Sequence, residues 1–400
     1  MAAIKALVKP ELLAWTRSRA RVAIEDAAKA ANVTTDRIRQ WEAGEEAPTV
    51  AQLRCLAEKY HFPLAVFYLP GPPADFQPLR DFRRLPDYQL EPISANLAFH
   101  IKNAHERREI ALELYQDSDT SPARFSLKAT LNDEPEVIGE KIRKFLGVDE
   151  KSQKEASSNK RAFDYWRRKM EEHDILVFVV SGPHYSVSLQ EMRGFAIAKP
   201  ELPAIVVNGK DPSQGGKAFT LLHELTHVVL GESAISNGAT EELVSSPEEQ
   251  NIERFCDQVA AAAIMPRQMM LSMAGSANSA ERQWSDSELR AMSNAIGASR
   301  EAVLLRLVTL RRATWKFYME QRPRFLEEYR KAAEEKSQKE VKIKRPTWLM
   351  LWNGRGYTRI VLRSYHDRRI TLNDASSYLG AKVKHIPALE LATFSSPGVS

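Results

Sequence analysis

The stretch KAFTLLHELTHVVLG, residues 217–231, carries the strongest structural signal in the chain. Apolar residues recur in it at helical spacing, and Gly231 is placed to end a helix. His223 and His227 therefore lie one turn apart on one helix face, close enough for both imidazole rings to reach a single zinc ion, Zn²⁺. Glu224 projects about 100° away from that face. There it can act as a general base that takes a proton from a water molecule and later passes it to a leaving amine.

A second helix is expected over NIERFCDQVAAAAIMP, residues 251–266, ending near its proline. Glu253 and Asp257 are four positions apart, so they share a face of this helix. We expect Glu253 to supply the third zinc ligand and Asp257 to orient a ligand imidazole by accepting its other N–H. The alanines at 260–263 would let this helix approach the first one closely. Four other glutamates remain possible third ligands: Glu241, Glu242, Glu248 and Glu249.

The HExxH pattern alone is only suggestive, because a chain with nine histidines can contain it by chance. The alternative is a metal-free helix whose histidines are surface polar groups. A structural zinc site usually has four protein ligands, often cysteines, whereas three ligands with an open position are typical of a catalytic one. The expected set of two histidines and one glutamate therefore favours an enzyme.

Three short runs upstream, 174–182, 193–198 and 203–209, are rich in β-branched or aromatic residues and predict strands. We expect the last two to form a small sheet behind the histidine-bearing helix. An edge strand of such a sheet can bind an extended peptide by backbone pairing. Arg193 and Asn208 are candidate peptide contacts, although turn or surface roles suit them equally.

Together, KAFTLLHELTH, ERFCDQVAAAAIMP and the upstream strands resemble the ImmA/IrrE family of bacterial metallopeptidases over roughly residues 160–312. The resemblance implies a gluzincin-like zinc peptidase. In this chain it assigns His223, His227 and Glu253 as zinc ligands and Glu224 as the catalytic acid and base.

The N-terminal part of the chain carries a different motif. Within residues 26–70, two short helical patterns are separated by a turn at Asn32, a residue type that tolerates the left-handed conformation. Thr34 or Thr35 can cap the second helix, whose Trp41 faces inward. The outer side chains near its N-terminal end could reach base edges in a major groove: Thr34, Thr35, Asp36, Arg37 and Gln40.

This segment resembles the DNA-binding domain of XRE/Cro-type phage and plasmid repressors, a five-helix domain. The helix-turn-helix spacing, the string WEAGEEAPT (41–49) and the following LRCLAEKYHFPLAVFY carry the resemblance. It implies binding to operator DNA in the major groove, with a homodimer as a possible state. The alternative is a helical bundle used only for dimerisation or protein contact, since Asp36 is an unusual neighbour for phosphates.

A chain of 400 residues is long enough for several domains. We expect a mainly α fold with a small β-sheet (α+β). The polar run at 149–160 is expected to be a loop, and the C-terminal region to mix strand-like and helical pieces. The expected order is an XRE-type helix-turn-helix domain (1–70), a Pro/Arg-rich connector with a long bridging helix (71–118), a zincin-like metallopeptidase domain (119–312), a charged helical linker (313–345) and a C-terminal accessory domain (346–400).

Composition indicates a cytoplasmic protein without a membrane partner. No apolar run approaches the roughly 18 residues that a bilayer requires, and the N-terminus lacks the features of a signal peptide. Cys55 and Cys256 are expected to be buried thiols rather than a disulfide. The net charge of +5 permits a nucleic-acid partner without requiring one.

The order of the two modules resembles that of single-chain regulators of phages, integrative elements and toxin–antitoxin loci. The resemblance implies a DNA-binding zinc endopeptidase that cleaves a repressor or an antitoxin-like protein. Tethering to DNA would raise its effective concentration near DNA-bound substrates. Two alternatives stay open: a non-enzymatic regulator or antitoxin with a structural or sensory zinc domain, and self-cleavage within the connector at 71–95.

Overall fold

The chain divides into two compact units in the computed structural model. Unit 1 comprises Met1–Pro78 and Gln89–Asn103, and unit 2 comprises Leu79–Tyr88 and Ala104–Ser400. The chain thus leaves unit 1, contributes a short segment to unit 2, and returns before it enters unit 2 again along helix α5 (Ala95–Gln116). The structure describes residues 5–6, 8–20, 22–60, 62, 64–68, 71, 80–81, 94–118, 120–158, 161–180, 182, 185–236, 247–275, 281–338 and 344–394.

Unit 1 contains the predicted pair of helices with a turn between them. Its helices are α1 (Pro10–Arg19), α2 (Ile24–Ala31), α3 (Thr35–Ala43), α4 (Val50–Tyr60) and a 3-10 helix (Leu64–Tyr68). α2 ends at Asn32, whose φ of 53° is left-handed as expected. Thr34 caps α3, because its side-chain oxygen accepts a hydrogen bond from the backbone N–H of Arg37. Trp41 is buried in the core as predicted, and the last of the five expected helices is the 3-10 helix.

One five-stranded sheet forms among the described residues of unit 2, in the order β1-β5-β3-β4-β2. Its strands are β1 (Arg80–Asp81), β2 (Leu176–Val180), β3 (Gly194–Ile197), β4 (Ala204–Asn208) and β5 (Ala234–Ser236). β2 is parallel to β4, and β3 is antiparallel to both β4 and β5. β1 pairs in parallel with β5. The fold is therefore mainly α with a small β-sheet, as predicted.

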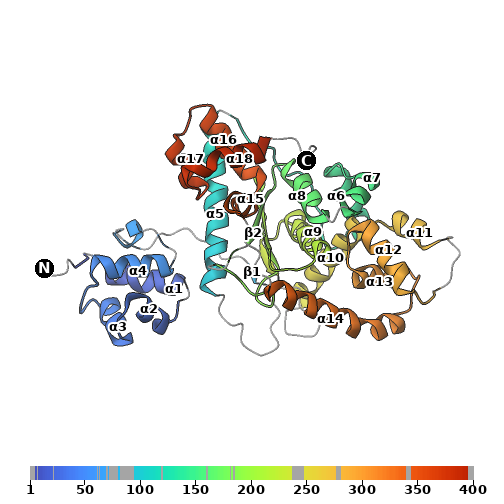
Figure 1. Ribbon diagram of the computed structural model, residues 1–400, viewed down its shortest axis with the longest axis horizontal. Helices are drawn as coiled ribbons and strands as arrows, with labels where there is room; N and C mark the ends of the chain where they lie inside the picture. The colour runs from blue at the N-terminus through green and yellow to red at the C-terminus, as the bar shows by residue number, and fades with distance from the viewer. Residues whose placement is uncertain are drawn as a thin grey trace. The chain divides into compact units, whose positions relative to one another are not determined.

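Helices lie on both faces of this sheet (Figure 1). Unit 2 contains the part of α5 from Ala104 onward. Its other helices are α6 (Pro135–Phe145), α7 (Glu150–Ser158), α8 (Ala162–Glu171), α9 (Gln214–Leu230), α10 (Pro247–Ile264), α11 (Arg267–Ala274), α12 (Asp286–Ile296), α13 (Arg300–Thr309), α14 (Trp315–Gln338), α15 (Arg345–Asn353), α16 (Arg355–His366), α17 (Leu372–Tyr378), a 3-10 helix (Val383–His385) and α18 (Ile386–Phe394). On one face, Val177 and Ile205 share a core with Leu221 of α9. On the other face, the ring of Phe178 meets the ring of Tyr357 from α16 at 6.2 Å. A sheet buried on both faces explains why its strands are continuous apolar runs.

α10 packs closely against two helices rather than one. Ala260 and Ala263 belong to the core that α9 also contributes to, which agrees with the expected close approach. Ala262, however, faces α6, where a Cβ placed on Gly139 would lie only 2.8 Å from the Ala262 Cβ. Contact on both sides fixes α10, and with it the position of Glu253.

The prediction of a loop at 149–160 is wrong, because residues 150–158 form α7. The buried face of this helix is polar, so it lacks the apolar periodicity that marks most helices. Gln153 is 1% exposed, and its amide donates to the backbone carbonyls of Ile264 and Ile296. Arg143 of α6 donates to the Gln153 side-chain oxygen. Hydrogen bonds to distant carbonyls, rather than apolar contacts, secure this helix.

The expected strand-like pieces after residue 346 do not occur, since the described part of this region is helical. Its first helices pack onto the second face of the sheet, where a buried Arg167–Glu171 pair holds them. The Arg167 guanidinium donates to the carbonyl of Leu351, and the Glu171 carboxylate accepts from the backbone N–H of Arg355. The aromatic and β-branched residues here serve helix packing against that face.

None of the described helices is long and apolar enough to cross a membrane. Both cysteines are free thiols, as expected. Cys256 is buried, but Cys55 is exposed, so the prediction that both are buried is wrong for Cys55.

Candidate metal centre

Helix α9 holds its two histidines inside the protein. The helix begins after Ser213, whose hydroxyl accepts a hydrogen bond from the backbone N–H of Gly216. It ends at Gly231, whose φ of 78° is left-handed. His223 is 5% exposed and His227 is 0% exposed. They are therefore not the surface polar groups of the metal-free alternative.

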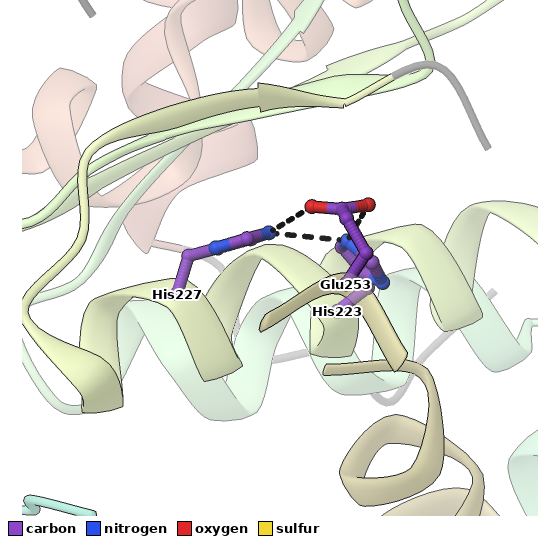
Figure 2. A group of neighbouring side chains, drawn as sticks. All are labelled: His223, His227 and Glu253. Carbon is purple, nitrogen blue, oxygen red and sulfur yellow. Dashed lines mark hydrogen bonds and ion pairs between the residues drawn. The ribbon is translucent and has the colours of Figure 1, made fainter. Parts of the chain in front are cut away.

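Three side chains converge at this point (Figure 2). The Nε2 atoms of His223 and His227 are 3.2 Å apart. The carboxylate of Glu253, from α10, lies 3.5 Å from His223 Nε2 and 3.2 Å from His227 Nε2. In a tetrahedral zinc site with bonds of about 2.0–2.1 Å, neighbouring ligand atoms are about 3.3 Å apart. The three separations match that spacing, so these residues fit a zinc ion.

The electrostatics of the group also favour a cation. Burial lowers the pKa of His223, but the Glu253 carboxylate and the Asp257 hydrogen bond outweigh it, so that this pKa is well above its ordinary value. Burial by itself would raise the pKa of Glu253. The neighbouring His223 and His227 lower it by more than burial raises it, so the pKa of Glu253 is below its ordinary value. A negative charge buried among imidazole nitrogens needs a positive partner, which a bound metal ion or a proton can provide.

Asp257 lies on the outer side of the same group. Its Oδ1 is 2.8 Å from the Nδ1 atom of His223. That contact leaves the Nε2 atom directed toward His227 and Glu253. Asp257 therefore fixes the orientation of one imidazole, the arrangement that holds many metal-binding histidines.

Glu224 directly follows His223 in α9 and does not belong to the group. Its side chain is 0% exposed, and it packs against β3 at Gly194. A Cβ on Gly194 would lie 2.8 Å from Glu224 Oε1 and 2.8 Å from Thr220 Cγ2. Only glycine leaves room for the carboxylate at this position. The sequence interpretation missed this role, although a glycine inside a strand pattern often marks a close approach of this kind.

Among the residues that the structure describes, one group of three or more potential metal ligands occurs, namely His223, His227 and Glu253. Glu248 and Glu249, in the first turn of α10, do not join it. Glu241 and Glu242 lie outside the described residues.

The two candidate peptide contacts differ from one another in the structure. Asn208 is 0% exposed, and its side-chain amide donates to the carbonyls of Val187 and Met192, so it holds a loop. It is not available to a peptide. Arg193 remains partly exposed and lies 3.8 Å from the carboxylate of Asp211.

The expected DNA contacts lie at the start of α3. Arg37 pairs with Glu46 at 2.6 Å, and Asp36 pairs with Arg39 at 2.6 Å. These pairs are at the surface, where ion pairs are weak and readily exchange partners. The outer residues are exposed or partly exposed: Thr34, Thr35, Asp36, Arg37 and Gln40.

Two histidines from one helix and a glutamate from a second helix are compatible with a metallopeptidase site, in which a further glutamate such as Glu224 serves as general base. Residues 170–308 match the family model of the IrrE N-terminal-like domain, a domain of the M78 peptidases. The matched segment contains all four of these side chains and indicates a metallopeptidase domain. For this segment the resemblance to the ImmA/IrrE family is confirmed. Searches of curated proteins and of solved structures gave no match.

Proposed function

We propose that this chain is a DNA-binding, zinc-dependent endopeptidase that regulates transcription. One observation carries the peptidase part: three buried ligand atoms have zinc-site spacing, and a buried glutamate outside this group follows the first ligand in α9. His223, His227 and Glu253 would bind the metal. Because no fourth ligand joins them among the described residues, a coordination position stays open for chemistry.

Zinc in such a site acts as a Lewis acid toward a carbonyl oxygen and lowers the pKa of a water molecule. Glu224 supplies the proton transfers. Its carboxylate accepts a proton as the water attacks the peptide carbonyl, and it returns that proton to the amine as the C–N bond breaks. The products are a carboxylate and an ammonium group, which together carry both protons of the water, so that Glu224 gains no net proton. Asp257 holds His223 in the tautomer that binds metal.

Unit 1 is proposed to bring this activity to DNA. A capped helix follows a left-handed turn, and the exposed start of α3 presents Arg37 and Gln40, side chains suited to base edges in the major groove. A homodimer on a palindromic operator would suit this geometry. A repressor or an antitoxin-like protein bound nearby is the proposed substrate, because a shared DNA site raises the local concentration of both.

A second candidate is a non-enzymatic transcriptional regulator or antitoxin whose zinc site is structural or sensory. The burial of the site favours this reading: Glu224 and His227 are both 0% exposed. The two candidates differ in what Glu224 does, since a sensory site needs its ligands but not a general base.

Zinc content and cleavage together test the proposal. Wild-type protein and the Glu224→Gln variant should each hold about one zinc ion per chain, because Glu224 is not a ligand. Wild-type protein should cleave unfolded casein, and the variant should be at least about a hundredfold slower. Equal cleavage by the two proteins would overturn the role of Glu224. If zinc-loaded wild type shows no cleavage while operator binding responds to zinc, the second candidate is favoured. If neither protein binds zinc after reconstitution, both candidates are overturned at this site.

A further inference from the structure

The edge of the sheet nearest to Glu224 is covered by the chain itself. β3 lies against Glu224 through Gly194. β5 then pairs with β3, with Ser236 opposite Gly194 and Ile235 opposite Phe195. Figure 2 shows the chain leaving α9 and returning as a strand that passes over the ligand group. On this side of the site, a peptide that extended the sheet would therefore have to pair with the outer edge of β5.

That outer edge has an occupant in the structure. β1 pairs with it in parallel, with Arg80 opposite Ala234 and Asp81 opposite Ile235. β1 comes from the connector, and only its segment Leu79–Tyr88 is assigned to unit 2. The chain on either side of this segment belongs to unit 1. Arg80 and Asp81 are thus the described residues of the connector that pair with the sheet.

The pairing of β1 is short enough to exchange. It involves two residue pairs, whereas the parallel pairing of β2 with β4 involves five. Each lost pair releases only one or two backbone hydrogen bonds, and water can replace them. In this arrangement the chemistry-bearing groups are enclosed, since Glu224 and His227 are 0% exposed. Buried side chains in the site and an occupied sheet edge are together what a resting state of the enzyme would present.

We propose that the outer edge of β5 docks an extended peptide segment and that the connector strand β1 is its resident competitor. An open strand edge recognises main-chain groups, so the partner is defined by an extended backbone more than by its sequence. Naming that partner as the substrate rests on the proposed peptidase function. A tethered strand acts at an effective concentration on the order of a millimolar, so free peptides bind weakly until β1 leaves.

Peptide binding by the full-length chain tests this proposal. The probe is a fluorescein-labelled peptide with the sequence of residues 76–86, FQPLRDFRRLP, followed by fluorescence anisotropy. The double variant Arg80→Pro/Asp81→Pro removes the backbone N–H groups of β1, and the matched control Arg80→Ala/Asp81→Ala keeps them. The proline variant should bind the probe at least about tenfold more tightly than wild type or the alanine control. Equal binding by all three, or no binding by the proline variant, would overturn the proposal.

A covalent lock provides an independent test that does not depend on proline. Neighbouring strands lie about 4.8 Å apart, within the Cα separation that a disulfide spans. The variant Arg80→Cys/Ala234→Cys, in a Cys55→Ser background, should therefore form a disulfide on oxidation and lose residual probe binding. Reduction should restore the wild-type level. Failure of the pair to form, or unchanged binding after it forms, contradicts the proposal.

Neither measurement uses zinc or proteolysis. A chain without peptidase activity can still show strand exchange, and an active peptidase can fail to show it. The two proposals therefore stand or fall separately.

Discussion

Two helices of this chain, α9 in unit 2 and α3 in unit 1, both carry polar side chains in a pattern that predicts function. On α9, His223 and His227 are buried and converge with Glu253. On α3, Arg37 is exposed and pairs with Glu46 at the surface. The sequence motif is similarly clear in both helices. The structure fixes the positions of the motif side chains on α9, whereas it leaves those on α3 exposed to water.

Burial explains the difference. A charged group inside a protein must find a partner, because its transfer from water is costly. The convergence of two imidazoles and a carboxylate within the interior therefore requires a positive charge, either a bound metal ion or a proton. At the surface, water satisfies Arg37 whether or not DNA is present, and an exposed ion pair contributes little. The comparison predicts that substitutions at the metal centre have large effects and that those at the surface have smaller ones.

The largest effect is expected for Glu253→Gln. The amide keeps the shape of the side chain but removes the negative charge between the two imidazoles, so zinc affinity should fall more than about a hundredfold. Competition with a zinc-binding dye measures the zinc affinity. Glu248→Gln, one of the earlier rival ligands on the same helix, is the matched control and should bind zinc like wild type. Zinc retention by Glu253→Gln would remove the basis of the comparison.

A smaller effect is expected for Asp257→Asn. The variant leaves all three ligands in place and weakens only the contact that orients His223. Zinc affinity should fall about tenfold to a hundredfold. The same dye competition reports it, and Asp257→Glu should recover part of the loss. If Asp257→Asn matches Glu253→Gln, Asp257 acts as a ligand rather than as a positioning residue.

The surface of α3 provides the third test. Arg37→Ala should weaken binding to operator DNA about tenfold, the range of one base contact. Glu46→Gln releases Arg37 from its pair and should strengthen binding at low salt. Fluorescence anisotropy over a range of salt concentrations measures both. DNA binding that neither substitution changes would place the DNA contact away from Arg37, and no DNA binding at all would favour the helical-bundle alternative for unit 1.

The smallest effect is expected at an exposed carboxylate of unit 2. The hydrogen bond from Arg282 and the cap at Ser285 lower the pKa of Glu288 from 4.5 to about 2. A lowered pKa means that the charged form stabilises the fold above about pH 4.5 and that this stability is lost as the pH falls toward 2. Because the side chain is 41% exposed, Glu288→Gln should cost less than about 1 kcal/mol at pH 7.

Urea unfolding of the zinc-free protein checks this prediction. The difference between wild type and Glu288→Gln should be constant from pH 7 to about pH 4.5 and then narrow. A large difference in the free energy of unfolding at pH 7 would contradict the comparison of the two regions, because it would show that the exposure of a charged group does not limit its contribution.

Local patterns in the sequence determined the elements that carry the motifs. Helical periodicity places His223 and His227 on one face, and the residue types at Asn32 and Thr34 specify a turn and a cap. The apolar runs gave β2, β3 and β4, and the i, i+4 spacing put Glu253 and Asp257 on one face of α10. These features depend on residues a few positions apart, so a single sequence contains them.

Only the tertiary structure decided the features that join distant residues. Gln153 secures α7 through carbonyls more than a hundred positions away, and Gly194 makes room for Glu224 thirty positions later. The pairing of β1 with β5 joins residues 80–81 to 234–235. Backbone hydrogen bonds carry little residue-specific pattern, because every residue except proline offers the same main-chain groups. A glycine such as Gly194 can signal a close approach, but it does not tell which distant side chain comes close. For that reason the sequence specifies which side chains could perform the chemistry, while the fold decides which segment covers the edge beside them.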